Sequence, residues 1–343
     1  MGVDLGDLIP RTPVDLKSLS GKTIAIDAYN ALYQFLAIIR QPDGTPLMDH
    51  TGKITSHLSG LFYRTCNLLE LGIKVIYVFD GTPPALKEAE IKRRMRVKEE
   101  AVKKYEIALK EGRIEEARMY AQMTSHLKDY MTEDAKRLLT LMGVPWVQAP
   151  SEGEAQAAYL VRKRDADFCA SQDYDSLLFG APHLLRNLTI SGRRKLPRKK
   201  VYVEVVPEII ELDRVLKELG ITREQLIDIG ILVGTDFNPN GIKGIGPKSA
   251  LKLIKTYGSL EKALPAIKKA EFPVEPARIR EIFLHPNVTD DYKIEWKDPD
   301  VDGVISFLCG EKDFSEKRVR KALEKAIGGM KKARARRTLE AWF

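Results

Sequence analysis

The stretch TIAIDAYNALYQFL, residues 23–36, decides the fold, because an apolar run that ends in an aspartate passes directly into a helical pattern. A second apolar run, KVIYVFD at Lys74–Asp80, also closes with an aspartate. Neither run alternates with polar residues, which is typical of strands buried on both faces. Helices expected at Ala28–Arg40 and about Thr55–Leu71 lie between them. The pattern predicts an α/β fold with a mostly parallel central sheet flanked by helices.

The same alternation returns further along the chain. We expect a helix near Glu133–Met142, another after Ser151, and strands near Val144–Val147, Asp167–Ser171, Leu184–Leu188 and Val201–Val206. After about Asp213 the pattern is mostly helical, with a glycine-rich turn at Asn240–Gly246. The length of 343 residues fits one large or two moderate domains.

Residues 82–130 are a long charged stretch that is broken at Gly112. The helical periodicity is clear, but the apolar stripe is thin for a helix that packs in a core. We interpret this stretch as a helical insertion that projects from the sheet. A solvated helical hairpin with no further role is the alternative.

Composition restricts the class of protein. Basic residues outnumber acidic ones by 56 to 48, and the net charge of +8 is compatible with a polyanionic partner. Cys66, Cys169 and Cys309 match neither a zinc spacing nor a disulfide framework, so we expect reduced thiols. Residues 1–10 lack the features of a signal peptide, and no run of about 18 apolar residues occurs. We therefore expect an intracellular, cytoplasmic protein without a membrane segment.

Seven acidic residues stand where a parallel sheet would gather them, at or just after the carboxyl ends of strands or helices. They are Asp27, Asp80, Glu152, Glu154, Asp173, Asp175 and Asp236. Each has an ordinary explanation on its own. An aspartate after a strand is usually a turn residue, and a glutamate behind the expected N-cap Ser151 usually complements the helix dipole.

The combination points to metal. Bringing several carboxylates together without cations would cost several kcal/mol in repulsion and desolvation. Neither histidine nor cysteine lies beside these acids, so oxygen ligands favour Mg²⁺ or Mn²⁺ over zinc. Two such ions about 4 Å apart are the standard arrangement for in-line displacement at phosphorus.

Six strings in family order make the sequence similar to the flap endonucleases of DNA replication and repair. They are TIAIDAYNALYQFL, SHLSGLFYRT, VIYVFDGTPPALK, APSEGEAQAAYL, SQDYDSLLFG and VGTDFNPNGIKGIGPKSAL. The resemblance implies a PIN-like nuclease core in which the seven acids hold two Mg²⁺ ions, Mn²⁺ being able to substitute. One set would be Asp27, Asp80, Glu152 and Glu154, and the other Asp173, Asp175 and Asp236. The implied reaction is hydrolysis at the base of 5′ flaps, with 5′→3′ exonuclease activity, in Okazaki fragment maturation and base excision repair.

The resemblance also assigns roles to residues outside the acid cluster. Lys87 and Arg94 would act with Asp175 in catalysis by directing positive charge at the scissile phosphate, and Tyr33 would stack on a base beside the cut. Further DNA contacts would come from Arg40, Arg64, Glu152, Gly234 and Asp236. The competing readings are solvated cations for the lysine and arginine, and a core side chain for the tyrosine.

The string GIKGIGPKSALKLI, residues 241–254, is not a Walker A loop, because Pro247 separates Gly246 from the lysine. Glycines that admit a phosphate to main-chain N–H groups, followed by a helix N-terminus, would suit a phosphate clamp. An ordinary interhelical turn is the alternative. The resemblance implies a helix–two-turn–helix at 223–257 that grips duplex DNA through Gly244, Gly246 and Lys248, with K⁺.

The expected organisation has five parts: 1–81 and 131–260 as the nuclease core, 82–130 as the helical arch, 261–334 as a C-terminal helical region, and 335–343 as a tail. The tail ends in RRTLEAWF and resembles the peptide that binds the sliding clamp. Leu339, Trp342 and Phe343 would fill its apolar positions, while Arg336 stands where glutamine is usual. A tail that folds onto its own core is the alternative. We expect a monomer whose partners are branched DNA and the clamp.

Two other functions stay open at this point. Another nuclease of the same superfamily, such as a 5′→3′ exonuclease or a junction resolvase, would share the acids. A non-catalytic DNA-binding adaptor would be a different class of protein.

Overall fold

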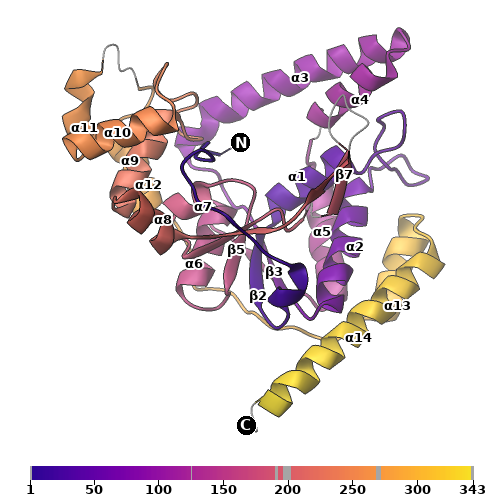
Figure 1. The fold of residues 1–343 in the computed structure, drawn as a ribbon. Helices are drawn as coiled ribbons and strands as arrows, with labels where there is room; N and C mark the ends of the chain where they lie inside the picture. The colour runs from indigo at the N-terminus through magenta and orange to yellow at the C-terminus, as the bar shows by residue number, and fades with distance from the viewer. Residues whose placement is uncertain (1, 125, 190–191, 196–201, 268–271, 341–343) are drawn as a thin grey trace.

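A computed structural model describes residues 2–124, 126–189, 192–195, 202–267 and 272–340, and its central sheet lies between helices on both faces (Figure 1). The sheet has seven strands in the spatial order β1 (Thr12–Pro13), β9 (Glu208–Glu211), β6 (His183–Arg186), β5 (Phe168–Ala170), β2 (Thr23–Asp27), β3 (Lys74–Phe79) and β4 (Trp146–Gln148). The five strands from β6 to β4 are parallel. Strand β9 runs antiparallel to β6, and β1 antiparallel to β9. The predicted, mostly parallel α/β sheet is confirmed.

Both faces of the central strands are buried, as their unbroken apolar runs predicted. Ala25 and Ile76 face one hydrophobic cluster, whereas Ile24 and Val75 face the other. The first cluster is covered by α6 (Gly153–Arg162), α7 (Asp175–Leu178), α8 (Leu212–Leu219), α9 (Arg223–Val233), α10 (Pro247–Tyr257), α11 (Leu260–Ala263) and α12 (Pro276–Leu284). The second is covered by α1 (Ala28–Ile38), α2 (Ser56–Glu70), α5 (Asp129–Leu141), α13 (Val301–Ile305), η4 (Ser306–Glu311) and α14 (Glu316–Glu340).

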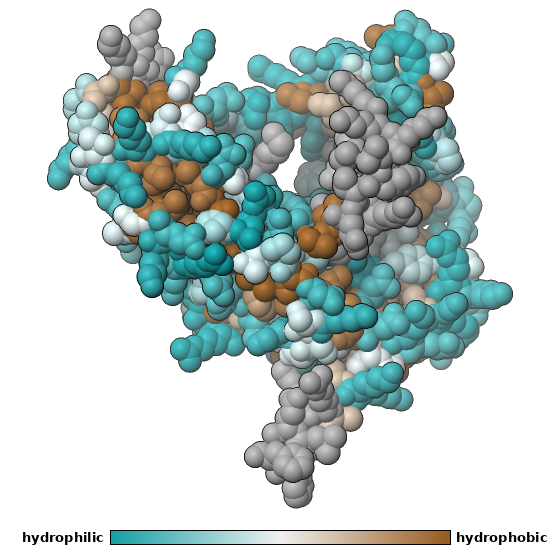
Figure 2. Space-filling view, in the orientation of Figure 1, coloured by the Kyte–Doolittle hydropathy of each residue, from teal (hydrophilic) through white to brown (hydrophobic). Residues whose placement is uncertain are grey.

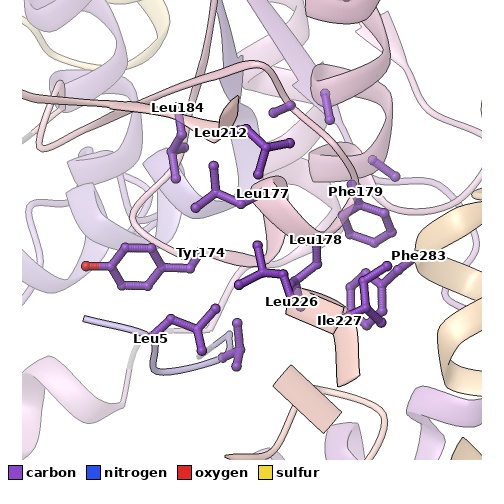
Figure 3. Packing of buried hydrophobic residues seen from close by; sticks show 14 of the residues in the cluster. Leu5, Tyr174, Leu177, Leu178, Phe179, Leu184, Leu212, Leu226, Ile227 and Phe283 are labelled. Carbon is purple, nitrogen blue, oxygen red and sulfur yellow. The ribbon is translucent and has the colours of Figure 1, made fainter. Parts of the chain in front are cut away.

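Aromatic and branched side chains bind the helical region after β9 to the sheet. Figure 3 shows Leu177 and Leu178 of α7 among the side chains of the first cluster, with Leu226 of α9 beside them. The rings of Phe179 and Phe283 lie 4.8 Å apart between centroids. This packing fixes α9, and the turn that follows it, against the carboxyl edge of the sheet.

The charged stretch forms a helical hairpin of η2 (Ala85–Lys87), α3 (Glu88–Lys110) and α4 (Ile114–Met123). In Figure 1, α3 extends across the top of the molecule, away from the sheet, and Figure 2 shows the surface hollowed beneath it. The two helices meet through four buried alanines, Ala101, Ala108, Ala117 and Ala121. Small side chains give helices close contact with little apolar area, which explains the thin stripe.

The strand expected near Val201–Val206 is present, but two strands of the central sheet were missed. The stretch Val201–Val206 does not enter the central sheet, because β8 (Tyr202–Val205) pairs with β7 (Gly192–Lys195) in a separate two-stranded sheet. Strand β9 was not expected, since its EIIE sequence has only two apolar residues. Strand β1 is only two residues long and carries no strand signal. Two short helical turns complete the fold, η1 (Leu16–Leu19) and η3 (Leu264–Ala266). Of the described helices, none is both long and apolar enough to cross a bilayer.

Candidate active site

The carboxyl ends of the parallel strands place the first acids at one sheet edge. Asp27 is the last residue of β2 and is paired with Val78 of β3, so Asp80 emerges next to it, just beyond β3. Asp173 and Asp175 follow β5, which lies on the other side of β2. This is the edge at which parallel sheets bind ligands.

Main-chain donors hold these aspartates in place. Asp27 is the N-cap of α1, and its Oδ1 accepts the Asn30 N–H at 2.9 Å. Asp80 Oδ1 accepts the N–H of Gly153 at 2.5 Å. The expected N-cap Ser151 was wrong: Glu152 is the N-cap of α6 and its side chain makes no capping bond. Asp80 supplies that bond from another strand, which joins the start of α6 to the acid cluster.

Glu154 and Asp175 are buried and hydrogen-bonded. Glu154 Oε1 accepts from the hydroxyls of Ser171 and Ser176. Asp175 Oδ1 accepts the main-chain N–H of Val3 at 2.7 Å, so the N-terminal segment reaches into the site. A Cβ at Gly2 would lie 2.7 Å from that same carboxylate oxygen, and the close approach therefore needs a glycine.

Asp236 comes from a tight turn after α9. Gly234 ends the helix with a φ of +117°, and a Cβ there would lie 2.6 Å from the Gly241 nitrogen. Asn238 is buried and fixes the turn, because its Oδ1 accepts the Thr235 hydroxyl at 2.7 Å and its Nδ2 donates to the Ile231 carbonyl at 2.6 Å. The turn aims Asp236 at the cations of the hairpin.

Lys87 and Arg94 enter the acid cluster from the base of the hairpin. Lys87 Nζ pairs with Glu152, and with Asp236 Oδ2 at 3.2 Å. Arg94 pairs with Asp236 and, at 2.8 Å, with Glu90. Both cations therefore contact acids of the cluster, and their role in catalysis stays a prediction.

Crowding of the acids is visible in their pKa values. Burial, and then repulsion by Glu152, raises the pKa of Asp80 to about 6. Burial, and then repulsion by Asp236, raises that of Asp175 to about 7. The pKa values of Asp27 and Glu154 rise well above their ordinary range for the same two reasons, with Asp80 and Asp175 as the respective neighbours. Added positive charge would relieve this strain.

A divalent ion with oxygen ligands fits this donor set. The acids supply oxygen only, and burial, followed by repulsion between the acids, raises the pKa values of Asp80 and Asp175 even though Lys87 acts to lower them. In the described part of the chain, no group of three acidic, histidine or cysteine side chains is already arranged as a metal site. Lys87 and Arg94 of the hairpin form ion pairs with carboxylates of Glu152 and Asp236.

The other residues expected to contact DNA lie in different settings. The Tyr33 ring is half-buried on α1, and Lys98 Nζ lies 4.6 Å from its centroid. Arg40 donates to the Leu36 and Gly44 carbonyls, both at 2.9 Å, and Arg64 donates to the Leu188 carbonyl. Both arginines thus hold main-chain carbonyls of this chain, and their DNA contacts stay predictions.

The glycine-rich turn joins α9 to α10 and is open to solvent. A Cβ at Gly244 or Gly246 would meet nothing within 4 Å, and Gly244 has a φ of +86°. Gly246 is the N-cap of α10, Pro247 occupies the first turn, and Lys248 is exposed. The main-chain N–H groups at this helix start have no side-chain cap, as a phosphate clamp requires.

The tail that is predicted to bind the sliding clamp lies mostly outside the described residues. Trp342 and Phe343 lie outside the described residues. Leu339 falls within α14, but its side chain also lies outside what the structure describes. The assignment of these residues stays a prediction.

Sequence reasoning missed the side chains that hold the acids. Asn30, Asn238 and the main chain of Val3 each bond an acid or the turn that carries it. One signal was present: Asn30 and Gln34 are four residues apart on a helix, a spacing at which amide side chains meet.

Comparison with known proteins identifies the family and agrees with the fold. Family profiles described as XPG N-terminal domain and XPG I-region match residues 4–101 and 143–236. The chain is 59% identical to flap endonuclease 1 of Staphylothermus marinus over the full length of both, and 62% identical to that of Hyperthermus butylicus over 95% of this chain and 94% of the relative.

Solved structures give the same result. Flap endonuclease-1 from Methanococcus jannaschii is 45% identical, with a TM-score of 0.76 over 96% of this chain and 99% of that one. The catalytic core of Rad2 in complex with a DNA substrate is 25% identical, with a TM-score of 0.70 over 95% of this chain and 100% of that one. Identity of this extent over whole chains, together with the shared fold, shows that the chain belongs to the flap endonuclease family.

Proposed function

We propose that this protein is a structure-specific nuclease that hydrolyses a phosphodiester of branched DNA at the base of a 5′ flap. The observation that carries the proposal is the acid cluster, in which seven carboxylates from five separate segments meet at one sheet edge beneath two cations. The family relationship supports the same activity. Its setting would be Okazaki fragment maturation and base excision repair, with 5′→3′ exonuclease activity beside it.

The acid cluster is the proposed metal site. Nucleases of this family depend on metal, generally Mg²⁺. Two ions would be held by Asp27, Asp80, Glu152 and Glu154 on one side and by Asp173, Asp175 and Asp236 on the other. When bound, they would supply positive charge at the scissile phosphate and lower the pKa of the attacking water.

The hairpin cations would add to the charge that the substrate meets. Lys87 and Arg94 already contact acids of the cluster, so a phosphate drawn to the site comes within reach of both. Fixed positive charge in a partly buried site stabilises the charge that develops on phosphate oxygens during cleavage. The half-buried Tyr33 ring would provide the stacking surface for the neighbouring base.

The two remaining DNA elements would position the substrate without reading its sequence. The surface is hollowed beneath α3 (Figure 2), and this shape supports the arch assignment of residues 82–130. The open turn between α9 and α10 would hold the duplex backbone through Gly244, Gly246 and Lys248, with K⁺. The division into core, arch, helical region and tail is proposed together with these roles, as are a monomeric state and binding of the sliding clamp.

One gel assay tests the activity. Flap DNA labelled at its 5′ end is incubated with the protein in Mg²⁺ or in EDTA. We expect a released flap only in Mg²⁺, and faster cleavage of flaps than of nicked, bubble or four-way-junction DNA. Equal rates on all four substrates would instead favour a broader nuclease. Absence of cleavage with intact DNA binding would favour the adaptor.

Asp175→Ala tests the acid cluster itself. We expect cleavage to be lost while flap binding persists, because this buried carboxylate lies among the proposed metal ligands. Asp213→Ala removes an exposed aspartate from the first turn of α8 and is the matched control. Cleavage by Asp175→Ala at the rate of the control would refute the role of Asp175.

A further inference from the structure

A chain of three side-chain hydrogen bonds runs from Thr189, through two residues of α1, to an aspartate of the acid cluster. The Thr189 hydroxyl contacts Gln34 Oε1. Gln34 Nε2 donates to Asn30 Oδ1 at 2.6 Å, and Asn30 Nδ2 contacts Asp173 Oδ2 at 3.3 Å. None of these three polar residues was assigned a role by the sequence motifs.

The Asp173 carboxylate, at the end of this chain, determines which group donates in every bond. An ionised carboxylate can only accept, so Asn30 must present its NH₂ group to Asp173. The Asn30 carbonyl then faces Gln34, which must donate to it, and the Gln34 carbonyl in turn accepts from the Thr189 hydroxyl. All donors therefore point toward the anion, an arrangement in which neighbouring bonds polarise and strengthen one another.

Asn30 also touches a second acid. Its main-chain N–H donates to Asp27 Oδ1 at 2.9 Å, while its side chain reaches Asp173. Asp27 ends β2 and Asp173 follows β5, and burial, then repulsion by Asp80 and Asp173, raises the pKa of Asp27. Asp27, Asn30 and Thr189 line one small cavity, so the contacts lie within a single local environment.

We propose that Asn30 is a positioning residue that sets the distance and orientation between Asp27 and Asp173, and that Gln34 and Thr189 fix the orientation of its amide. A neutral amide suits this task, because it bonds the carboxylate without competing for metal as a further acid would. Thr189 lies just before β7, so the orientation of Asp173 is tied to the point where the β7–β8 hairpin leaves the core. This inference rests on the proposed metal site.

Asn30→Leu is the central variant, since leucine has a similar volume and keeps the main-chain N–H that Asp27 accepts. We expect Mg²⁺ binding to the DNA-free protein, measured by calorimetry, to weaken by about 10- to 100-fold, the usual effect of removing a partner of a metal ligand. For flap cleavage at fixed Mg²⁺ we expect kcat to fall while the KM for DNA stays unchanged. Asn67→Leu, at an exposed position of α2, is the matched control.

Thr189 provides a gentler second test. Thr189→Val removes the hydroxyl and Thr189→Ser keeps it, with the rest of the chain of bonds intact. We expect the valine variant to weaken Mg²⁺ binding in the same sense as Asn30→Leu, by a smaller factor, and the serine variant to restore it. Equal Mg²⁺ affinity of the valine and serine variants would show that Thr189 has no part in positioning.

The outcomes separate this inference from the proposed function. If the unaltered protein fails to cut flap DNA in Mg²⁺, the proposed function is wrong. If it cuts, and Asn30→Leu binds Mg²⁺ as tightly as Asn67→Leu does, only the positioning role is refuted. A loss of DNA affinity equal to the loss of kcat in Asn30→Leu would also refute it, because positioning of Asp173 predicts an effect on metal and turnover alone.

Discussion

Replacing Lys87 with methionine removes the cation nearest the acid cluster and keeps most of the side-chain volume. Lys87 pairs with Glu152 and Asp236, and its side chain is only 16% exposed. Burial opposes its charge, but Glu152 and Asp236 outweigh that effect and raise the pKa of the ammonium. The variant therefore leaves Glu152 without its lysine partner and Asp236 with Arg94 alone.

The expected loss of stability follows from this burial. Removing one member of a buried ion pair costs about 3–5 kcal/mol, and uptake of protons by the acids keeps the loss near the lower end. We therefore expect Lys87→Met to lower the free energy of unfolding by about 3 kcal/mol in EDTA. Saturating Mg²⁺ should reduce this deficit, since the ions replace the lost charge. Single-turnover cleavage should slow by about 10²- to 10³-fold.

Chemical denaturation with and without Mg²⁺ measures the first effect. Lys92→Met is the control, because Lys92 pairs with Glu88 at 2.6 Å and the two side chains are 66% and 68% exposed. Such an exposed pair contributes about 0.3–0.5 kcal/mol, so the control should unfold almost as the unaltered protein does. If both variants unfold alike in EDTA, Lys87 does not compensate the acids and the electrostatic account of the site is refuted.

Two further predictions concern other parts of the chain. His57 is buried, and among the described residues neither of its ring nitrogens has a hydrogen-bond partner; burial, reinforced by Lys312, lowers its pKa to about 3. The unfolded chain binds this proton near pH 6.5, so stability is complete above that pH and falls by about 1.4 kcal/mol per pH unit toward pH 3. His57→Leu should remove this share of the pH slope in urea titrations; an unchanged slope would show that His57 is protonated when folded. Deleting residues 339–343 should weaken binding to a sliding clamp in surface plasmon resonance and leave the basal flap-cleavage rate unchanged, whereas equal clamp affinity would refute the tail assignment.

The centre of the sheet could be predicted from sequence because its strands are buried on both sides. Thr23–Asp27 was placed without error, since five consecutive buried residues leave no other reading of the apolar run. The edges of the sheet could not be predicted in the same way. Strand β9 is half-exposed, and its two central isoleucines are too few for a periodic signal. Strand β9 lies between β6 and the two-residue edge strand β1, and it is these partners, which local sequence does not encode, that make it a strand.

The acid cluster was predictable in membership but not in its supports. Asp27 and Asp80 can be recognised in the sequence because each closes an apolar run. The hydrogen bond from Gly153 to Asp80 cannot, since it joins residues 73 positions apart. Ser151 has the local properties of an N-cap, yet the side chain that accepts from the first turn of α6 is that of Asp80, which is distant in sequence. Lys87 likewise has no local feature that separates it from the many solvated cations of the hairpin. Only the fold brings it to Asp236.

Lys87 and Arg94 of the hairpin contact carboxylates that are also proposed ligands of the divalent ions. A carboxylate oxygen that is engaged by an ammonium or guanidinium group is less available to an incoming ion, and the converse holds equally. If the ions bind as proposed, ion uptake and the contact of α3 with the sheet edge would be linked equilibria, and each would shift the other by the same free energy. When divalent ions are scarce, Lys87 and Arg94 at the base of the hairpin would therefore serve as built-in counterions for the acid cluster.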